Sequence, residues 1–289
     1  MRRVAVTGLG AVTPLGHDAR STWDAAVSGR SGVDWIRSFD ATAYPIRIAS
    51  EVKDFDPVDV VGPKEARRLE RNVVLAVAAA REAWKDAGVD GVDPARAGIL
   101  VGSAIGGVMG EGACVLLLED LERANERGAR VYAEILGYGT SNDAHHMAQP
   151  DPASIGVAEM MRAALGRAGI EPGRVGYLNA HGTSTPQGDL AETKAIKEVF
   201  GDHAYDLAVS STKSMLGHLF GAAGAVEAMM CVRAIHEGVL PPTINYRTPD
   251  PECDLDYVPN EARHTQVDVA LSNAMGLGGH NACVLVGRV

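Results

Sequence analysis

Residues 179–186 read Asn-Ala-His-Gly-Thr-Ser-Thr-Pro. The short apolar run 175–179 predicts a buried strand, and the motif begins at the last residue of that strand. His181 would therefore stand at the end of that strand. Ligand sites in α/β sheets gather at the carboxyl ends of strands, and the loops there often carry catalytic residues. A histidine that only caps the strand is the simpler alternative, but the hydroxyl groups and the glycine beside His181 favour a site.

A second stretch of this kind, residues 211–224, reads Ser-Thr-Lys-Ser-Met-Leu-Gly-His-Leu-Phe-Gly-Ala-Ala-Gly. It follows a predicted strand at 207–211 and enters a helix rich in glycine and alanine. Lys213 and His218 are costly to bury at such a junction unless they are paired or used. Glu192 is the candidate partner for Lys213.

Elsewhere, strands and helices alternate along the chain. The other predicted strands are 3–7, 98–102, 114–118, 267–272 and 282–287, and the predicted helices are 21–28, 63–87, 154–168, 189–200 and 217–235. This alternation predicts an α/β layered fold.

The composition excludes several classes of protein. With 46% hydrophobic and 22% charged residues, the 289-residue chain is typical of a folded globular protein. A net charge of −10 gives no general attraction to nucleic acid, and no apolar run approaches the ~20 residues of a membrane span. The four cysteines, Cys114, Cys231, Cys253 and Cys283, form no CxxC pair, which fits neither a zinc site nor a disulfide scaffold. We therefore expect a cytoplasmic protein without nucleic-acid or membrane partners.

A glycine-rich stretch, 8–13, follows the first predicted strand and suggests a dinucleotide-binding turn. The third glycine of that fingerprint is replaced by Thr13, and Pro14 follows where a helix should open. The stretch is therefore interpreted as structural.

Taken together, these stretches carry a resemblance. The chain resembles the β-ketoacyl-(acyl carrier protein) synthases of the type II elongating class, in the thiolase-like superfamily. The motifs NAHGTSTPxGD and KSxxGHxxGAAG are the most specific, and the match extends from residues 4–16 to residues 272–281. The resemblance implies five layers, α-β-α-β-α, in two similar halves, 1–135 and 136–289, with the first half truncated internally.

The implied reaction is a decarboxylating Claisen condensation of acyl and malonyl thioesters, in fatty-acid or polyketide biosynthesis. The family's catalytic histidines match His181 and His218, its lysine matches Lys213, and Glu192 matches the acid that pairs with it. Neutral imidazole donors would stabilise the enolate oxygen as its charge develops.

Further functional residues also follow from the resemblance. Thr183 and Thr185 match hydroxyls that bind the pantetheine arm, and Met275 stands at the gate of the acyl pocket. No cofactor is required, because phosphopantetheine arrives on the acyl carrier protein. Positions that hold a structural sodium or potassium ion in some members match Asn179, Ala180, Glu227, Ser272 and Asn273.

A basic run near residue 67 fits an acidic carrier as partner. Lys64, Arg67, Arg68 and Arg71 are spaced by three and four residues, which puts them on one face of the predicted helix. A solvated helix face is the alternative. Because the chain is acidic overall, docking an acidic carrier needs a local positive patch, and Lys64, Arg67 and Arg68 match carrier-docking positions.

The chain departs from the family between residues 107 and 108, where the family has a long segment with the nucleophilic cysteine. That segment also carries part of the acyl pocket and much of the contact of the family's homodimer. None of the four remaining cysteines replaces the nucleophile by motif, so acyl transfer is not expected. The alternatives are a non-catalytic carrier-binding or partner subunit and an inactive fragment of the same fold.

Overall fold

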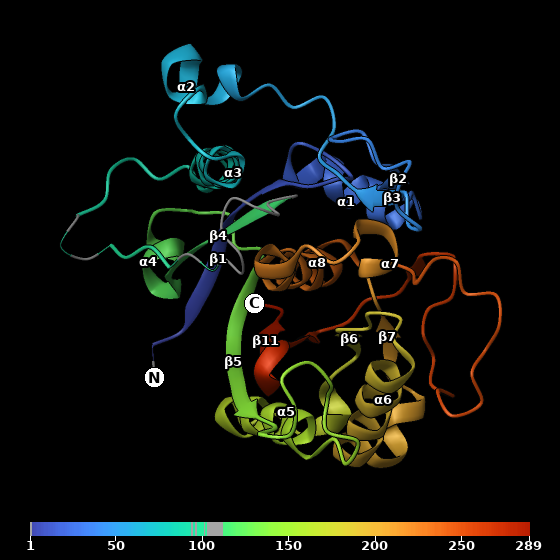
Figure 1. The fold of residues 1–289 in the computed structure, drawn as a ribbon. Helices are drawn as coiled ribbons and strands as arrows, with labels where there is room; N and C mark the ends of the chain where they lie inside the picture. Colours follow the sequence, from blue (N-terminus) through green and yellow to red (C-terminus); the bar gives the residue numbers. More distant parts are fainter. Residues whose placement is uncertain (1, 94, 96, 101, 103–111) are drawn as a thin grey trace.

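The computed structural model describes residues 2–93, 95, 97–100, 102 and 112–289. The junction between residues 107 and 108 lies outside this part. The fold centres on a mixed sheet of seven strands in the order β4-β1-β5-β11-β10-β6-β7 (Figure 1). These strands are β4 (Ala113–Asp120), β1 (Val4–Val12), β5 (Ala133–Asn142), β11 (His280–Gly287), β10 (Val269–Met275), β6 (Tyr177–Asn179) and β7 (Ala208–Ser210).

Within the described residues, eight α-helices and several short elements surround this sheet. The helices are α1 (Ala19–Val27), α2 (Pro57–Ala66), α3 (Arg71–Ala87), α4 (Leu121–Glu126), α5 (Ile155–Ala168), α6 (Pro186–Phe200), α7 (Lys213–Leu216) and α8 (Ala223–Glu237). The short strands are β2 (Val33–Trp35), β3 (Ile48–Ser50), β8 (Val239–Leu240) and β9 (Arg263–His264), which pair as β2-β3 and β8-β9. Short 3₁₀ turns include η5 (Phe220–Ala222) and η6 (Leu277–Gly279).

The sheet curls around α8, and this gives the fold five layers (Figure 1). Helix α8 contacts β4 at one end of the sheet and β10 and β6 toward the other. On the outer faces, α3 packs on β1 and β4, whereas α5 packs on β5 and β11. The order is therefore α3, then β4 and β1, then α8, then β11, β10 and β6, then α5, and this confirms the predicted layered α/β fold. The two β layers join where residues 4–6 pair with residues 133–135.

The same close contact between strand and helix occurs in both parts of the sheet. A Cβ atom on Gly10 of β1 would lie 1.9 Å from the carbonyl oxygen of Ala79 in α3. A Cβ atom on Gly139 of β5 would lie 1.7 Å from the carbonyl oxygen of Met160 in α5. Only glycine fits at either position. The glycines near residue 10 are thus structural, but they lie within a continuous strand, β1, and not in a turn after it.

Two expectations about elements are wrong, and one strand was missed. The predicted helix 63–87 is two helices, because α2 ends at Ala66 and α3 begins only at Arg71, after Glu70 takes an extended conformation. Residues 98–100 of the predicted strand 98–102 pair with no described strand, and Ile99 is 93% exposed. The sequence analysis also missed β5, a central strand of the sheet. The remaining predicted elements form, although β1 runs on to Val12 and α8 begins only at Ala223.

No helix in the described part of the chain is long and apolar enough to cross a membrane.

Candidate functional site

His181 lies directly after β6, where the motif at 179–186 predicts a site. The residue is 8% exposed. Its backbone N–H donates to Oε1 of Glu192 (2.9 Å), and the N–H of Gly182 donates to Oε2 of the same carboxylate (2.9 Å). Glu192, on α6, therefore fixes the backbone that carries the imidazole. The ring's Nδ1 is buried and has no hydrogen-bond partner among the described residues.

His218 lies between α7 and η5, and its ring meets that of His181. The ring centroids are 5.4 Å apart, and the planes cross at 85°. The backbone N–H of Phe220 donates to Nδ1 of His218 (3.3 Å). Because Nδ1 accepts this bond, the proton of the neutral ring is on Nε2.

Both imidazoles are neutral near pH 7. Burial, the nearby Lys213 charge and His218 lower the pKa of His181 to about 3. His218 is exposed, but desolvation of its ring and the Lys213 charge also lower its pKa. Two neutral rings side by side can each donate one N–H to an oxygen that gains negative charge.

Lys213 is paired with Glu227 of α8, and this corrects the expectation that Glu192 is its partner. Nζ of Lys213 bonds Oε1 of Glu227, and both side chains are buried. Glu192 is occupied by two backbone N–H groups and by Nδ2 of Asn273 (3.1 Å). Burial raises the pKa of Glu227 to about 7, an effect that Lys213 opposes and Glu192 increases. An acid within the apolar helix predicted at 217–235 was the available signal for this pair.

The residues expected to hold an alkali cation lie on β6, β10 and α8. Ser272 pairs in register with Asn179, and Asn273 reaches Glu192. Three buried oxygens, Oδ1 of Asn179, Oε2 of Glu227 and Oδ1 of Asn273, find no hydrogen-bond partner within the described part of the chain. Unpaired buried oxygens are what a hard cation needs, so this donor set fits a sodium or potassium ion.

The two threonines expected to bind pantetheine lie beside the histidines along the chain. Thr183 is half-buried and Thr185 is exposed, with their hydroxyl oxygens 3.2 Å apart. Met275, at the end of β10, is half-buried and packs against the core cluster around α5 and α6.

The basic residues near residue 67 are exposed, but they do not share one helix. Lys64 lies in the last turn of α2, Arg67 caps this helix, and Arg68 follows it 3.9 Å from Glu65. Arg71 belongs to α3, where its guanidinium donates to the carbonyl of Val52. Only the first three therefore remain as a patch.

All four cysteines have a raised pKa, in each case first because of burial. The pKa of Cys114 and Cys231 lies well above its ordinary value, and that of Cys283 is raised to about 12. Cys253, in the loop before β9, is half-buried, and its pKa is also raised. A thiol of this kind is not a thiolate at neutral pH and is a weak nucleophile.

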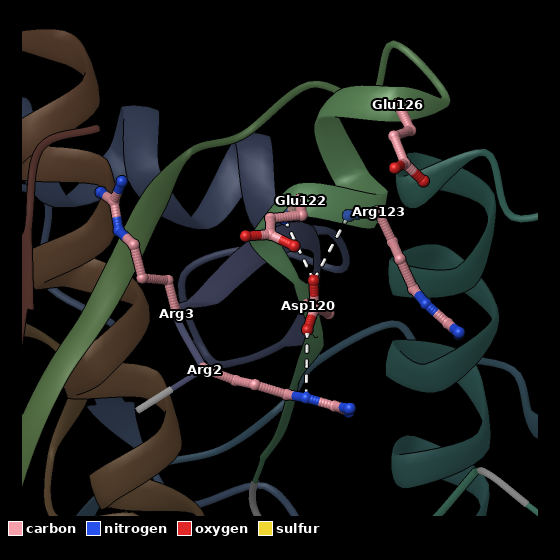
Figure 2. Close-up of a pocket in the computed structure, with 6 residues that line it drawn as sticks. All are labelled: Arg2, Arg3, Asp120, Glu122, Arg123 and Glu126. Atoms are coloured by element: carbon pink, nitrogen blue, oxygen red, sulfur yellow. Dashed lines mark hydrogen bonds and ion pairs between the residues drawn. The ribbon is translucent and has the colours of Figure 1, made fainter.

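A cavity of about 690 Å³, drawn in Figure 2, is lined by none of the site residues described above. It is lined by three arginines and three acids at the start of β1, the end of β4 and on α4. Arg2 already pairs with Asp120 (3.9 Å). None of the predicted site residues lines this cavity.

The fold and this pair of histidines define a ketosynthase. Residues 1–108 match the N-terminal domain of the beta-ketoacyl synthases, and residues 132–247 match their C-terminal domain. The chain belongs to the beta-ketoacyl synthase family, as its resemblance predicts.

Among its relatives is the 3-oxoacyl-[acyl-carrier-protein] synthase 2 of Coxiella burnetii, 36% identical over 409 aligned positions that cover 100% of this chain and 99% of that protein. The Staphylococcus aureus protein of the same name is 37% identical over 404 positions, with 98% of each chain covered. Two solved structures, the ishigamide ketosynthase/chain length factor and a beta-ketoacyl synthase from Burkholderia phymatum, share 29% and 26% identity, both with a TM-score of 0.88. Both alignments cover 100% of this chain. They cover 99% of the ishigamide protein's chain and 100% of the Burkholderia protein's chain. These structures confirm the thiolase-like fold.

The length of the first alignment bears on the missing segment. The alignment has 409 positions and this chain has 289 residues, so about 120 positions (409 − 289) are gaps in this chain. The N-terminal domain match ends at residue 108, next to the predicted junction. That the empty positions include the nucleophilic cysteine stays a prediction.

Proposed function

We propose that this chain performs the decarboxylating half of the ketosynthase reaction on a malonyl thioester and does not perform the acyl-transfer half. The observation that carries the proposal is the contrast at the site. Two neutral imidazoles lie 5.4 Å apart, while every thiol of the chain has a raised pKa.

In the proposed step, the bond between the malonyl Cα and its carboxylate breaks, and carbon dioxide leaves. The electron pair moves into the thioester to form an enolate, whose oxygen accepts hydrogen bonds from the imidazoles. Nε2 of His218 supplies one donor, because its Nδ1 is already bonded to Phe220. Protonation of Cα by water then gives an acetyl thioester.

The other site residues have supporting roles in this proposal. Glu192 holds the backbone of His181, and the Lys213–Glu227 pair keeps a positive charge near both rings, which disfavours imidazolium. Asn179, Ala180, Glu227, Ser272 and Asn273 would hold the alkali cation, which would neutralise part of the carboxylate charge.

An acyl carrier protein is the proposed source of the thioester. Lys64, Arg67 and Arg68 would dock it, Thr183 and Thr185 would bind its pantetheine arm, and Met275 would border the acyl pocket. One ketosynthase of the same fold, 24% identical, has been solved in complex with a type II polyketide acyl-carrier protein. A cytoplasmic location belongs to the same proposal.

The test is to incubate the purified chain with malonyl- and acyl-carrier thioesters and to measure carbon dioxide, small products and intact protein mass together. We expect carbon dioxide and acetyl-carrier without any protein adduct. His181→Ala and His218→Ala should each reduce the rate by about 10²–10³-fold. His264→Ala, at an exposed histidine of β9, is the matched control and should retain the rate.

An acyl adduct on a cysteine together with a β-ketoacyl product would show that a replacement nucleophile exists. Carrier binding without carbon dioxide release would favour the second candidate, a non-catalytic carrier-binding subunit. The raised pKa of all four thiols favours that candidate as well, whereas the neutral histidine pair favours the first.

A further inference from the structure

The imidazole of His218 stacks on the phenyl ring of Phe220, which has no part in the proposed reaction. The ring centroids are 5.0 Å apart, and the planes are 10° from parallel. His181 meets the same imidazole edge-on. His218 therefore lies between one ring that covers its face and another that borders it.

The backbone of Phe220 shows that this arrangement has a conformational cost. Its φ is +49°, in the left-handed region that residues with a Cβ rarely adopt and that glycine adopts freely. The chain thus places a large ring where the backbone favours glycine. In this conformation, the backbone N–H of Phe220 donates a hydrogen bond to Nδ1 of His218.

The core does not account for this ring. Phe220 is 37% exposed and belongs to none of the core clusters within the described residues, whereas its neighbour Leu219, 6% exposed, is buried in the core around α8. The ring contact recorded for Phe220 is with His218.

We propose that Phe220 is a positioning residue whose ring keeps the imidazole of His218 in one orientation and one tautomer; this rests on the proposed role of His218 in decarboxylation. A half-turn of the imidazole would exchange Nδ1 for a carbon atom and break the 3.3 Å bond to the Phe220 amide. Offset parallel stacking on the phenyl ring ties the imidazole to one plane, which leaves two orientations related by a half-turn, and the amide bond to Nδ1 selects one of them. Nε2 then stays directed at the developing oxyanion.

The tautomer can be read without any turnover, by long-range ¹H–¹⁵N correlation on protein labelled at its nine histidines. His218→Asn assigns the signal. We expect a single Nε2–H tautomer for His218 in the wild type, the same in Phe220→Tyr, and a mixture of tautomers in Phe220→Leu and Phe220→Met. Phe39→Leu is the matched control, because Phe39 is an exposed phenylalanine (54%) whose recorded ring contact is with Tyr44.

Kinetics provide the second readout. Phe220→Leu should lower kcat for malonyl decarboxylation by about 10- to 100-fold with little change in KM, and Phe220→Tyr should restore it. A wild-type chain that releases no carbon dioxide would refute the proposed function, and the tautomer measurement would still decide the role of Phe220. A single Nε2–H tautomer in folded Phe220→Leu and Phe220→Met, or an equal loss in Phe220→Tyr, would overturn the positioning role.

Discussion

The buried ammonium of Lys213 acts on two carboxylates, those of Glu227 and Asp189. Burial raises the pKa of Glu227 to about 7 and that of Asp189 to about 6, and the charge of Glu192 adds to both effects. Lys213 lowers the pKa of both acids. It is therefore the group that lets this cluster remain charged.

Replacing Lys213 with methionine should destabilise the protein by about 3–5 kcal/mol at pH 8, because Glu227 would be left buried without its partner. Denaturant unfolding monitored by circular dichroism measures this. Lys197→Met is the control: it breaks an exposed ion pair with Asp254 and should change the free energy of unfolding little. Equal effects of the two substitutions would refute the importance of the buried pair.

His181 predicts how stability depends on pH. Its pKa is about 3 in the folded protein and 6.5 in an exposed chain. Between these values the unfolded chain binds a proton that the folded one does not, so this contribution to stability is complete above pH 6.5 and is lost as the pH falls toward 3. His181→Asn should remove about 1.4 kcal/mol per pH unit of this slope between pH 6 and 4.

Urea titrations at several pH values measure this slope. His264→Asn, at an exposed histidine, should retain the wild-type profile. If the slopes of His181→Asn and the wild type coincide, His181 is not neutral in the folded state.

At the scale of elements, the sequence predicted most of the second half of the fold. Apolar residues recur with helical spacing in α5 and α6, and glycine follows each of these helices in a position that ends it. Strand β5 escaped notice because Gly137 and Gly139 interrupt its pattern, and these glycines are needed only because α5 packs so closely. Such a requirement comes from tertiary contact and cannot be read from a local window.

For the candidate site as well, the sequence predicted the main residues but not all of their contacts. His181, His218 and Lys213 stand in contiguous motifs, and the structure brings them together. The predicted partner of Lys213 was wrong, because the paired acid is Glu227 of α8 and not Glu192 of α6. The stacking of Phe220 on His218 was not predicted, because it depends on a positive φ at Phe220 that the sequence does not reveal.

Strand β4 forms one edge of the sheet, and among the described residues its outer side has no partner strand. Residues 113–118 read Ala-Cys-Val-Leu-Leu-Leu, without a charge or a proline to discourage pairing with another chain.

Leu118, which is 50% exposed, is the place to test this edge. Leu118→Lys should reduce aggregation on heating, measured by light scattering at equal concentrations. Leu277→Lys, at a 69% exposed leucine outside the sheet, should have a smaller effect. Equal protection by both would mean that general surface polarity, and not the edge, controls aggregation.

The patch of Lys64, Arg67 and Arg68 at the end of α2 predicts salt-dependent binding of an acidic carrier. Arg67→Glu with Arg68→Glu should weaken carrier affinity about tenfold at low salt and flatten its salt dependence, because attraction between exposed charges is screened within ~10 Å at 0.1 M salt. Titration calorimetry at two salt concentrations measures both quantities. Arg162→Glu, at another exposed arginine, on α5, should bind as the wild type. Unchanged binding by the double variant would identify the patch as a solvated surface.

At the scale of the whole molecule, α8 connects both ends of the curled sheet. Eleven of its residues are buried, and six of them have none of their surface exposed: Val226, Met229, Met230, Cys231, Val232 and Ala234. Because β4 and β10 both pack on this helix, they should unfold together. The predicted division of the chain at residue 135 falls inside β5, the strand that joins the two β layers, and the division into two similar halves stays a prediction.

Ala234→Leu should overpack this helix and cost about 1–3 kcal/mol. Far-UV circular dichroism and the fluorescence of Trp23, which is buried beside Arg233 of α8, should report one shared transition at lower temperature. Ala153→Leu, at an exposed loop alanine, is the control and should leave the transition unchanged. Two separate transitions would show that α8 does not couple the layers.

The pairing of the sheet also determines the order in which the chain can fold. Residues 4–6 must find residues 133–135, and β11 must find β5, so these pairs close loops of more than 125 residues. Among the paired strands in the described part of this sheet, β10 and β11 have the shortest connection, residues 276–279, whereas helix α6 separates β6 from β7. Since closing a long loop costs entropy before its contacts form, the β10–β11 hairpin should appear early in refolding and the pairing of β1 with β5 late. Ser272 and Asn273 would thus be in place on their hairpin before the first strand of the chain joins the sheet.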